Sequence, residues 1–181
     1  LEDAIADLSA DGLYVEVEGQ YVDEVLQVRE IEIEEDELEF KADVFEKTVV
    51  EPRDGSLVLS FGNATGTVDV RVTPDTMFLD DDASEPYDLN SIMIGDKVEI
   101  NARTDADGNI YASSLHREDD MGYEIEGPVE GIDEVSIDVL GVVFTGDMDT
   151  FFENGIPTVG NYAEVEDDDA DGIADSVEIE D

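Results

Sequence analysis

The sequence predicts an all-β protein of tandem small antiparallel β-barrel (OB-like) modules, preceded by an N-terminal half-module. Three observations indicate this fold: one stretch occurs three times, apolar residues alternate with polar ones, and turn signals come at short intervals. The three copies start at Gly12, Gly95 and Gly160, and each opens on an alternating segment. Such a repeat is one supersecondary unit copied along the chain, so it determines the architecture without indicating a function.

The repeated stretch predicts two strands joined by a turn, which form the back half of a module. The last copy runs from Gly160 to an Asp-Ala-Asp-Gly sequence at 169–172 and returns through Val177. The middle copy, from Gly95, contains the same tetrapeptide at 105–108, whereas the first copy lacks it. The tetrapeptide predicts a hairpin turn, because an Asp-Gly pair accepts the positive φ that such turns require.

The N-terminal copy predicts a hairpin with a bulge in its second strand. Leu26 and Val28 share one parity of alternation and Ile31 and Ile33 share the other. One extra residue near Arg29 would place all four on the same face. A hairpin alone is marginally stable. We therefore expect this half-module to pack on a neighbouring module, to be completed by another chain, or to be a truncated domain.

Each complete module has a front half of roughly three predicted strands before its hairpin. This front half ends in an Asp-Thr-x-Phe segment, at 75–78 and again at 149–152. Five or six short strands in about 60 to 80 residues is the size of a small closed or nearly closed barrel, and closure removes exposed sheet edges. We therefore place the back half of a module at residues 1–37 and complete modules at 38–120 and 121–181.

Charge excludes several functions. The chain has 181 residues, of which 52 are acidic and 8 basic, giving a net charge of -44, yet 41% are hydrophobic, enough for a packed core. Nucleic acids and anionic membrane surfaces both require Lys and Arg, so neither is an expected partner. The sequence has no apolar run long enough for membrane insertion and no cysteine for a disulfide or a thiolate site. The acidic excess suits high ionic strength and so favours a marine or halophilic source. The alternative is a cation-binding or simply very soluble surface protein.

These motifs resemble those of the bacterial family of domain of unknown function 5666. The resemblance rests on the Gly-x-x-Val-Glu-Val type of strand at 12–17, 95–100 and 160–165, on the Asp-x-Asp-Gly turn and on the Asp-Thr-x-Phe segment. It covers nearly the whole chain. It implies small β-barrel modules, often in tandem, in exported or envelope-associated proteins, and therefore a periplasmic, cell-surface or secreted location. It implies no catalytic residues, because the family has no assigned chemistry.

One pattern in the last copy has the spacing of a calcium loop, with carboxylates at the ligand positions and Gly172 at the sharp turn. The candidate ligands are Asp167, Asp169, Asp171, Asp175 and Glu178. Strands rather than helices flank the pattern, and the middle copy has Arg103 and Ser114 at the two end positions. We therefore favour a hairpin turn over a complete calcium loop, and a looser surface cation site over a full one. Calcium is the only cofactor that the sequence indicates.

The sequence contains no recognisable set of catalytic residues. The only imidazole is His116, in a predicted strand in which Leu115 points inward and His116 outward. An acid–base pair cannot be selected among 52 acidic residues. We therefore expect no enzyme activity, and a hydrolase that uses carboxylates is a distant third interpretation.

The expected function is that of a non-enzymatic structural or binding module of an exported bacterial protein. Its expected partners are cations and a protein or polysaccharide at the cell surface. The alternative is a calcium-dependent adhesion or carbohydrate-binding module, whose stacking residues would be Tyr14, Tyr21, Tyr123 and Tyr162. Such tyrosines more often lie partly buried in a barrel, with their hydroxyls reaching water.

Overall fold

A computed structural model of the chain describes residues 14–22, 25–34, 38–79, 87–119, 121–147 and 150–180. Every regular element in these ranges is a strand, which confirms the predicted all-β class. Within these ranges, no helix has the length and hydropathy needed to cross a membrane.

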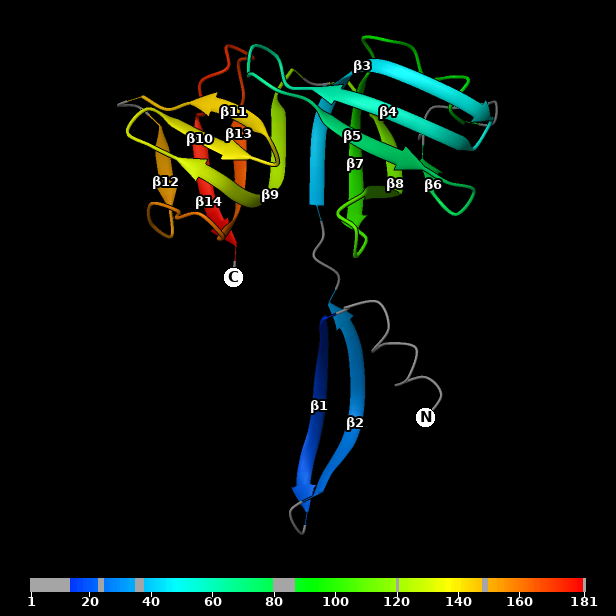
Figure 1. The fold of residues 1–181 in the computed structure, drawn as a ribbon, viewed down its shortest axis with the longest axis vertical. Helices are drawn as coiled ribbons and strands as arrows, with labels where there is room; N and C mark the ends of the chain where they lie inside the picture. The colour runs from blue at the N-terminus through cyan, green and yellow to red at the C-terminus, as the bar shows by residue number, and fades with distance from the viewer. Residues whose placement is uncertain are drawn as a thin grey trace.

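The first complete module is a closed barrel of five strands with one strand added at its edge (Figure 1). The barrel strands are β3 (Leu38–Glu51), β4 (Asp54–Ser60), β5 (Val68–Val72), β7 (Lys97–Thr104) and β8 (Ile110–Glu118). Antiparallel pairing joins β5 to β4, β4 to β3, β3 to β7 and β7 to β8. The parallel pair of β5 and β8 closes the ring, and β6 (Met77–Leu79) lies parallel to β8 outside it. This is an OB-like barrel.

The second module repeats this path with shorter strands. Its strands are β9 (Tyr123–Ile132), β10 (Ser136–Val139), β11 (Val142–Thr145), β12 (Phe151–Glu153), β13 (Tyr162–Asp167) and β14 (Ser176–Glu180). Here β9 pairs with β10 and β13, β10 with β11, and β13 with β14. A single parallel bridge between Thr145 and Ile173 takes the place of the β5–β8 pair. The edge strand β12 lies parallel to β14, as β6 lies parallel to β8.

The Asp-Thr-x-Phe segment has the same structural role in both modules. Thr76 Oγ1 donates to the carbonyl oxygen of Ala112, and Thr150 Oγ1 donates to that of Ala174, each at 2.8 Å. Each hydroxyl also accepts a backbone N–H from three residues earlier, that of Thr73 or Asp147. The threonine therefore fastens the edge strand to the back half of its module, which is a structural reason for the motif.

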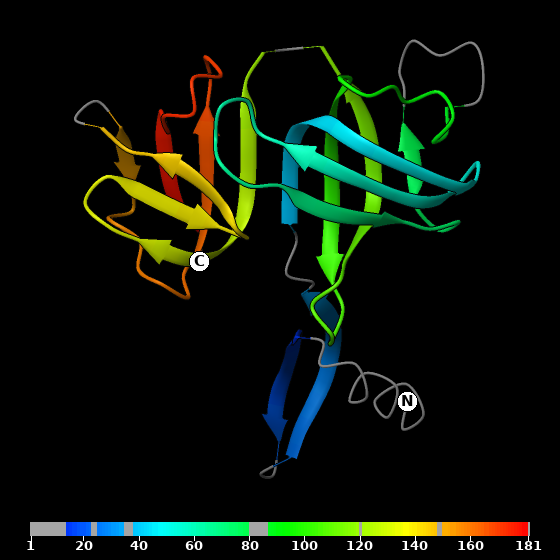
Figure 2. The ribbon, with the colours of Figure 1, turned by 45° about the horizontal axis from the view of Figure 1, so that its top comes forward.

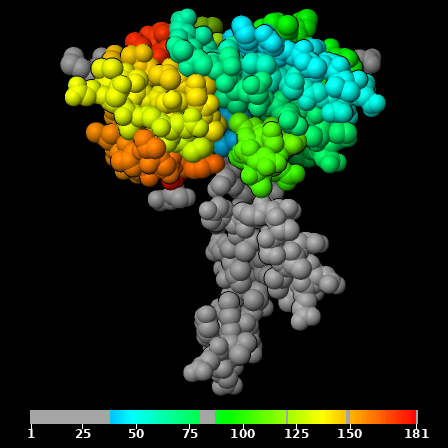
Figure 3. Space-filling view, in the orientation of Figure 1, coloured from blue at the N-terminus to red at the C-terminus, as the bar shows by residue number. Residues whose placement is uncertain are grey.

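The two barrels share one hydrophobic core and one sheet. Alternate residues of β3 and β9 point inward, so that Phe40 on β3 and Ile125 on β9 are both fully buried. These two residues are also cross-strand partners, because β3 pairs with β9 between the modules. A second connection is the bridge between Thr65 and Val143. The barrels consequently lie side by side (Figure 2), and their surfaces meet along the face shown in Figure 3.

The N-terminal hairpin consists of β1 (Tyr14–Val22) and β2 (Val25–Glu34), which form a separate two-stranded sheet. Its register shifts where Glu18 faces Glu30 and Gly19 faces Val28, so Arg29 has no opposite residue. This confirms the bulge predicted near Arg29. The covering surface that we expect for the hairpin depends on its side chains, which lie outside the described part of the chain.

Candidate functional site

The predicted calcium turn follows β13, and Asp167 is its structural anchor. The Asp167 side chain is fully buried, and its two carboxylate oxygens accept the backbone N–H groups of Asp171, at 3.1 Å, and Gly172, at 2.8 Å. A buried carboxylate that accepts two backbone hydrogen bonds holds the turn in one conformation. The first role of Asp167 is therefore to shape the turn.

The same turn is also a contact between the modules. The Asn63 side-chain amide donates to the carbonyl oxygen of Ala170 at 3.0 Å. Gly172 has a φ of +82°, and a Cβ added there would lie 2.8 Å from the backbone carbon of Asn63. Ala170 also has a positive φ, of 65°. The turn is thus held from two sides, by Asp167 of its own module and by Asn63 of the first module.

Three of the five candidate ligands come together at this turn. One carboxylate oxygen each of Asp167, Asp169 and Asp175 lie within 4.8 Å of one another. Asp171 lies beside them: its charge raises the pKa of Asp169 above the ordinary value, with smaller effects from burial, Asp175 and Asp167. These carboxylates have the oxygen chemistry that hard divalent cations prefer.

The fifth candidate, Glu178, lies apart from the turn. It is on β14, opposite Glu164 of β13 and next to Glu153 of β12. Its carboxylate is 3.3 Å from the side-chain nitrogen of Asn154. Because the chain continues from Asp175 as a strand, Glu178 projects from the sheet instead of returning to the turn.

The middle copy makes a different turn from the same tetrapeptide. Asp105 accepts the backbone N–H groups of Asp107 and Asn109, and the Asn109 side chain donates to both of its carboxylate oxygens. The Asn109 side chain is the main reason why the pKa of Asp105 lies below its ordinary value. The groups of three or more possible ligands found among the described residues do not include this turn.

A second acidic site, which the sequence reasoning missed, lies on the outer face of the shared sheet. We define the carboxylate face as Glu39, Glu99, Glu124, Glu164, Glu166 and Glu178. Glu124 faces Glu166 across β9 and β13, and Glu164 faces Glu178 across β13 and β14. Glu124, Glu164 and Glu166 each contribute one carboxylate oxygen to a cluster in which these three atoms lie within 4.8 Å of one another. Like charges directly opposite each other destabilise a sheet, so this face has an electrostatic cost.

Burial increases that cost. It raises the pKa of Glu124 to about 7, with further contributions from Glu164, Glu39 and Glu166, and with Lys41 acting in the opposite direction. Burial also raises the pKa of Glu164 and of Glu99. Glu39 contributes to all three shifts, so the face is one electrostatic unit across both modules. The alternation of the strands indicated that these residues point outward, but not which strands are neighbours.

His116 lies on β8, beside Glu99 of the carboxylate face. Its Nδ1 is 3.3 Å from Glu118 Oε1, and its cross-strand partner is Glu99. Leu115 is fully buried, so the predicted inward and outward directions of these two residues are confirmed.

The tyrosines considered for stacking differ in their surroundings. Tyr123 is only 8% exposed, its hydroxyl donates to Asp43 at 2.7 Å, and Lys97 Nζ lies 3.4 Å from the centre of its ring. Burial, followed by Asp43, raises the pKa of this phenol. Tyr162 is half-buried on β13, and the side chains of Tyr14 and Tyr21 lie outside the described part of the chain. Tyr123 is therefore a packed barrel residue and offers no free ring face.

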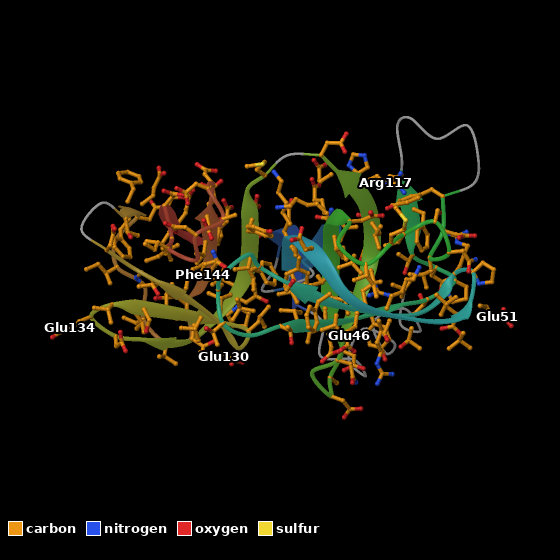
Figure 4. The ribbon with its side chains drawn as sticks, turned by 90° about the horizontal axis from the view of Figure 1, so that it is seen from above. Glu46, Glu51, Arg117, Glu130, Glu134 and Phe144 are labelled. Carbon is orange, nitrogen blue, oxygen red and sulfur yellow. The ribbon has the colours of Figure 1, made fainter. Side chains whose placement is uncertain are left out.

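A polar cleft of about 530 Å³ lies where the outer face of β4 and β5 meets the second module. The residues that line it include Ser56, Asp69, Arg71, Asn109, Glu130 and Leu140. Figure 4 shows Glu130 pointing outward from the second module, whereas Phe144 points into its interior. In OB folds, the face of the second and third strands and the loop between the fourth and fifth strands bind oligosaccharides and oligonucleotides. In the first module those elements are β4, β5 and the turn that contains Asn109.

Comparison with known families gives one match for each barrel. Residues 48–116 and residues 126–180 match the family described as Domain of unknown function (DUF5666). No curated protein and no solved structure matches the chain. The two matches lie in tandem and cover more than half of the 181 residues, in agreement with the repeat.

Proposed function

The chain belongs to the DUF5666 family, and we propose that it is a non-enzymatic binding module of an exported bacterial protein that holds a cationic partner on its carboxylate face. The observation behind this proposal is the cross-strand register of that face, which sets Glu124 opposite Glu166 and Glu164 opposite Glu178. A bound cationic group would offset the repulsion between these pairs. The proposed location, in the periplasm, at the cell surface or outside the cell, rests on the family resemblance.

The distribution of basic residues supports an external cation. No Lys, Arg or His occurs after Arg117, so the second module has no cation of its own in the sequence. Lys41, on β3, is the cross-strand partner of both Glu99 and Glu124, at the edge of the first module. The carboxylates of β13 and β14 lie beyond it and have no basic cross-strand partner in this sheet.

A non-catalytic role is supported by the position of the only imidazole. His116 pairs with Glu118 and faces Glu99, so its neighbours are carboxylates that hold and attract positive charge. A catalytic histidine would also need a nucleophile beside it, and the cross-strand partner of this histidine is a carboxylate, not a hydroxyl.

Calorimetric titration with a short oligolysine peptide tests the proposal. Because the pKa of Glu124 is about 7, a bound cation should displace a proton from it near neutral pH, which shows as a dependence of the measured heat on the buffer. The double variant Glu124→Gln/Glu164→Gln should bind more weakly and release no proton. The matched control is Glu46→Gln/Glu51→Gln, which replaces two exposed glutamates of β3 in the same way (Figure 4). Equal behaviour of the two variants would show that net charge alone attracts the peptide and would overturn the proposal.

The second candidate function is a calcium-dependent adhesion or carbohydrate-binding module. Two observations favour it: the polar cleft at β4 and β5, and the three aspartates gathered at the turn after β13. In the cleft, Arg71 lies over the Tyr111 ring at 5.7 Å and could contact a sugar from that position. Titration with neutral oligosaccharides, with and without calcium, tests this candidate. Arg71→Ala should abolish such binding and leave the binding of oligolysine unchanged.

A further inference from the structure

The two barrels differ most in the connection that leads from the edge strand into the back half. In the first module this connection runs from Leu79 to Lys97, and in the second only from Glu153 to Tyr162. The segments on either side of it are joined by matching hydrogen bonds in the two modules, those of Thr76 and Thr150. The first module therefore shows which segment the second module lacks.

In the first module the longer connection covers one end of the barrel. It supplies Leu89 and Ile92, both fully buried, which we call the apolar plug. The Leu89 N–H donates to the Pro52 carbonyl oxygen at 3.0 Å, and Lys47 Nζ donates to the carbonyl oxygens of Leu89 and Ile92. Leu89 packs against the start of β4, where a Cβ added to Gly55 would lie 3.1 Å from its Cδ1.

The second module has a pocket of about 200 Å³ at the corresponding place. Val135 occupies the position of Gly55. Its carbonyl oxygen accepts the N–H of Gly146, which follows β11, and in the first module Gly55 is the cross-strand partner of Val72, at the end of β5. The larger apolar side chains that line the pocket are Ile132, Val135, Ile137, Phe152, Ile156 and Val177. Ile156 is 70% exposed and Val135 is 60% exposed, so apolar surface covered in the first module remains open in the second.

The charges around the two sites also differ. Two basic side chains bind the backbone of the plug segment: Lys47 donates to the carbonyl oxygens of Leu89 and Ile92, and Arg117 donates to that of Ser91. The pocket of the second module is lined instead by Asp133, Glu134 and Asp147, and no basic residue follows Arg117 in the sequence. The second module therefore lacks both the apolar plug and the basic groups around it.

We propose that this pocket docks a segment of a partner protein that inserts one aliphatic or aromatic side chain flanked by Lys or Arg. The volume suits one such side chain, because an apolar cavity of about 150 Å³ holds a benzene molecule. The three carboxylates at the pocket complement the flanking basic residues. A second copy of the chain fits less well: its exposed Met93 and Ile94 belong to a molecule of net charge -44, which repels its own kind.

Fluorescence anisotropy with labelled peptides and the full chain tests the proposal. The probe is the chain's own plug sequence, Leu-Asn-Ser-Ile, flanked by lysines, and the control peptide has Ser in place of Leu and Ile. We expect the control peptide to bind about tenfold more weakly or worse, since burial of one such side chain accounts for a difference of that size. Ile156→Asp should weaken binding of the probe although it adds an attractive charge. The matched control, Ile94→Asp, alters an equally exposed isoleucine of the first module and should have no such effect.

Three results would overturn the proposal. Equal affinity of the two peptides would leave only electrostatic attraction, which is compatible with binding at the carboxylate face but not with docking in the pocket. Equal effects of Ile156→Asp and Ile94→Asp would place the peptide elsewhere. Self-association of the free chain that Ile156→Asp abolishes, measured by sedimentation, would make a second copy the occupant. If Glu124→Gln/Glu164→Gln loses oligolysine binding but still binds the probe more tightly than the control peptide, the carboxylate face and the pocket are separate sites.

Discussion

Phe61 and Phe144 pack edge to face across the junction of the two barrels, with ring centroids 6.3 Å apart and an interplanar angle of 71°. Phe61 follows β4 of the first module and Phe144 lies on β11 of the second, and both are fully buried. Phe40 continues the row, with its ring 6.4 Å from that of Phe61. The hydrophobic core is thus continuous from one module to the other.

Replacing Phe144 with Ala should therefore destabilise both modules together. We expect a loss of about 3–5 kcal/mol in the free energy of unfolding, the usual cost of removing a buried phenylalanine ring. Urea denaturation followed by circular dichroism should show one transition at a lower midpoint. The matched control is Phe151→Ala at a position that is 60% exposed, where the change should stay within about 0.5 kcal/mol. Two separate transitions, with only one shifted, would contradict a shared core.

Local features of the fold could be predicted from the sequence. The bulge at Arg29 followed from a change of parity between Val28 and Ile31, and the inward side of Leu115 followed from alternation. Such features depend on neighbours within a few residues, which the printed sequence shows directly.

Features set by distant residues could not be predicted. The Asp-Ala-Asp-Gly turn after β13 contacts the other module, where Ala170 receives a hydrogen bond from Asn63, 107 positions earlier. Similarly, alternation indicated that Glu124 and Glu164 point outward, but only the pairing of β9 with β13 shows that they lie on one face. The spacing of the repeated motifs shows that the first module has the longer connection, but only the structure shows that Leu89 and Ile92 within it are buried.

The pH dependence of stability provides a test of the carboxylate face. Glu124 has a pKa of about 7 in the folded chain, above its ordinary value of 4.5, so the folded state holds a proton that the unfolded state has released. Stability should therefore fall as the pH rises from about 4.5 to 7, and the full penalty should remain above pH 7. Glu124→Gln should melt at a higher temperature than the parent at pH 8 and show a flatter profile across that window. A variant that melts at the same temperature as the parent at pH 8 would show that Glu124 ionises at no cost.

Salt should stabilise the whole chain. The net charge of -44 disfavours the compact state at low ionic strength, and about 1 M sodium chloride shortens the Debye length to about 3 Å. The melting temperature should therefore rise from low salt to molar sodium chloride in the absence of calcium. Glu124→Gln/Glu164→Gln should reduce this rise more than Glu46→Gln/Glu51→Gln, because the first pair lies among other carboxylates. A flat or falling response would mean that charge repulsion does not limit stability.

Calcium should act at the turn after β13 and not through ionic strength alone. Asp169 is exposed there, and the charge of Asp171 raises its pKa above the ordinary value. A divalent cation bound by carboxylate oxygens of Asp167, Asp169 and Asp175 would relieve the repulsion between these side chains. Without helical flanks we expect weak binding, in the range of about 10⁻⁴–10⁻³ M known for extracellular modules. The measurement is the melting temperature in calcium chloride compared with sodium chloride at matched ionic strength. Asp169→Asn/Asp171→Asn should abolish the calcium-specific rise and keep most of the response to sodium.

Glu178→Gln is the control that separates the observed cluster from the calcium-loop template. Glu178 is the last ligand of the template, yet it lies on β14 next to Glu153 and Asn154. If the cluster of three aspartates binds the ion, Glu178→Gln should keep the calcium-specific rise that Asp169→Asn/Asp171→Asn abolishes. If Glu178→Gln also abolishes the rise, calcium draws Glu178 into a complete loop, and the turn must rearrange away from Asn63 to allow it. A parent chain that responds equally to the two salts would leave the turn with its structural role alone, the one fixed by the buried carboxylate of Asp167.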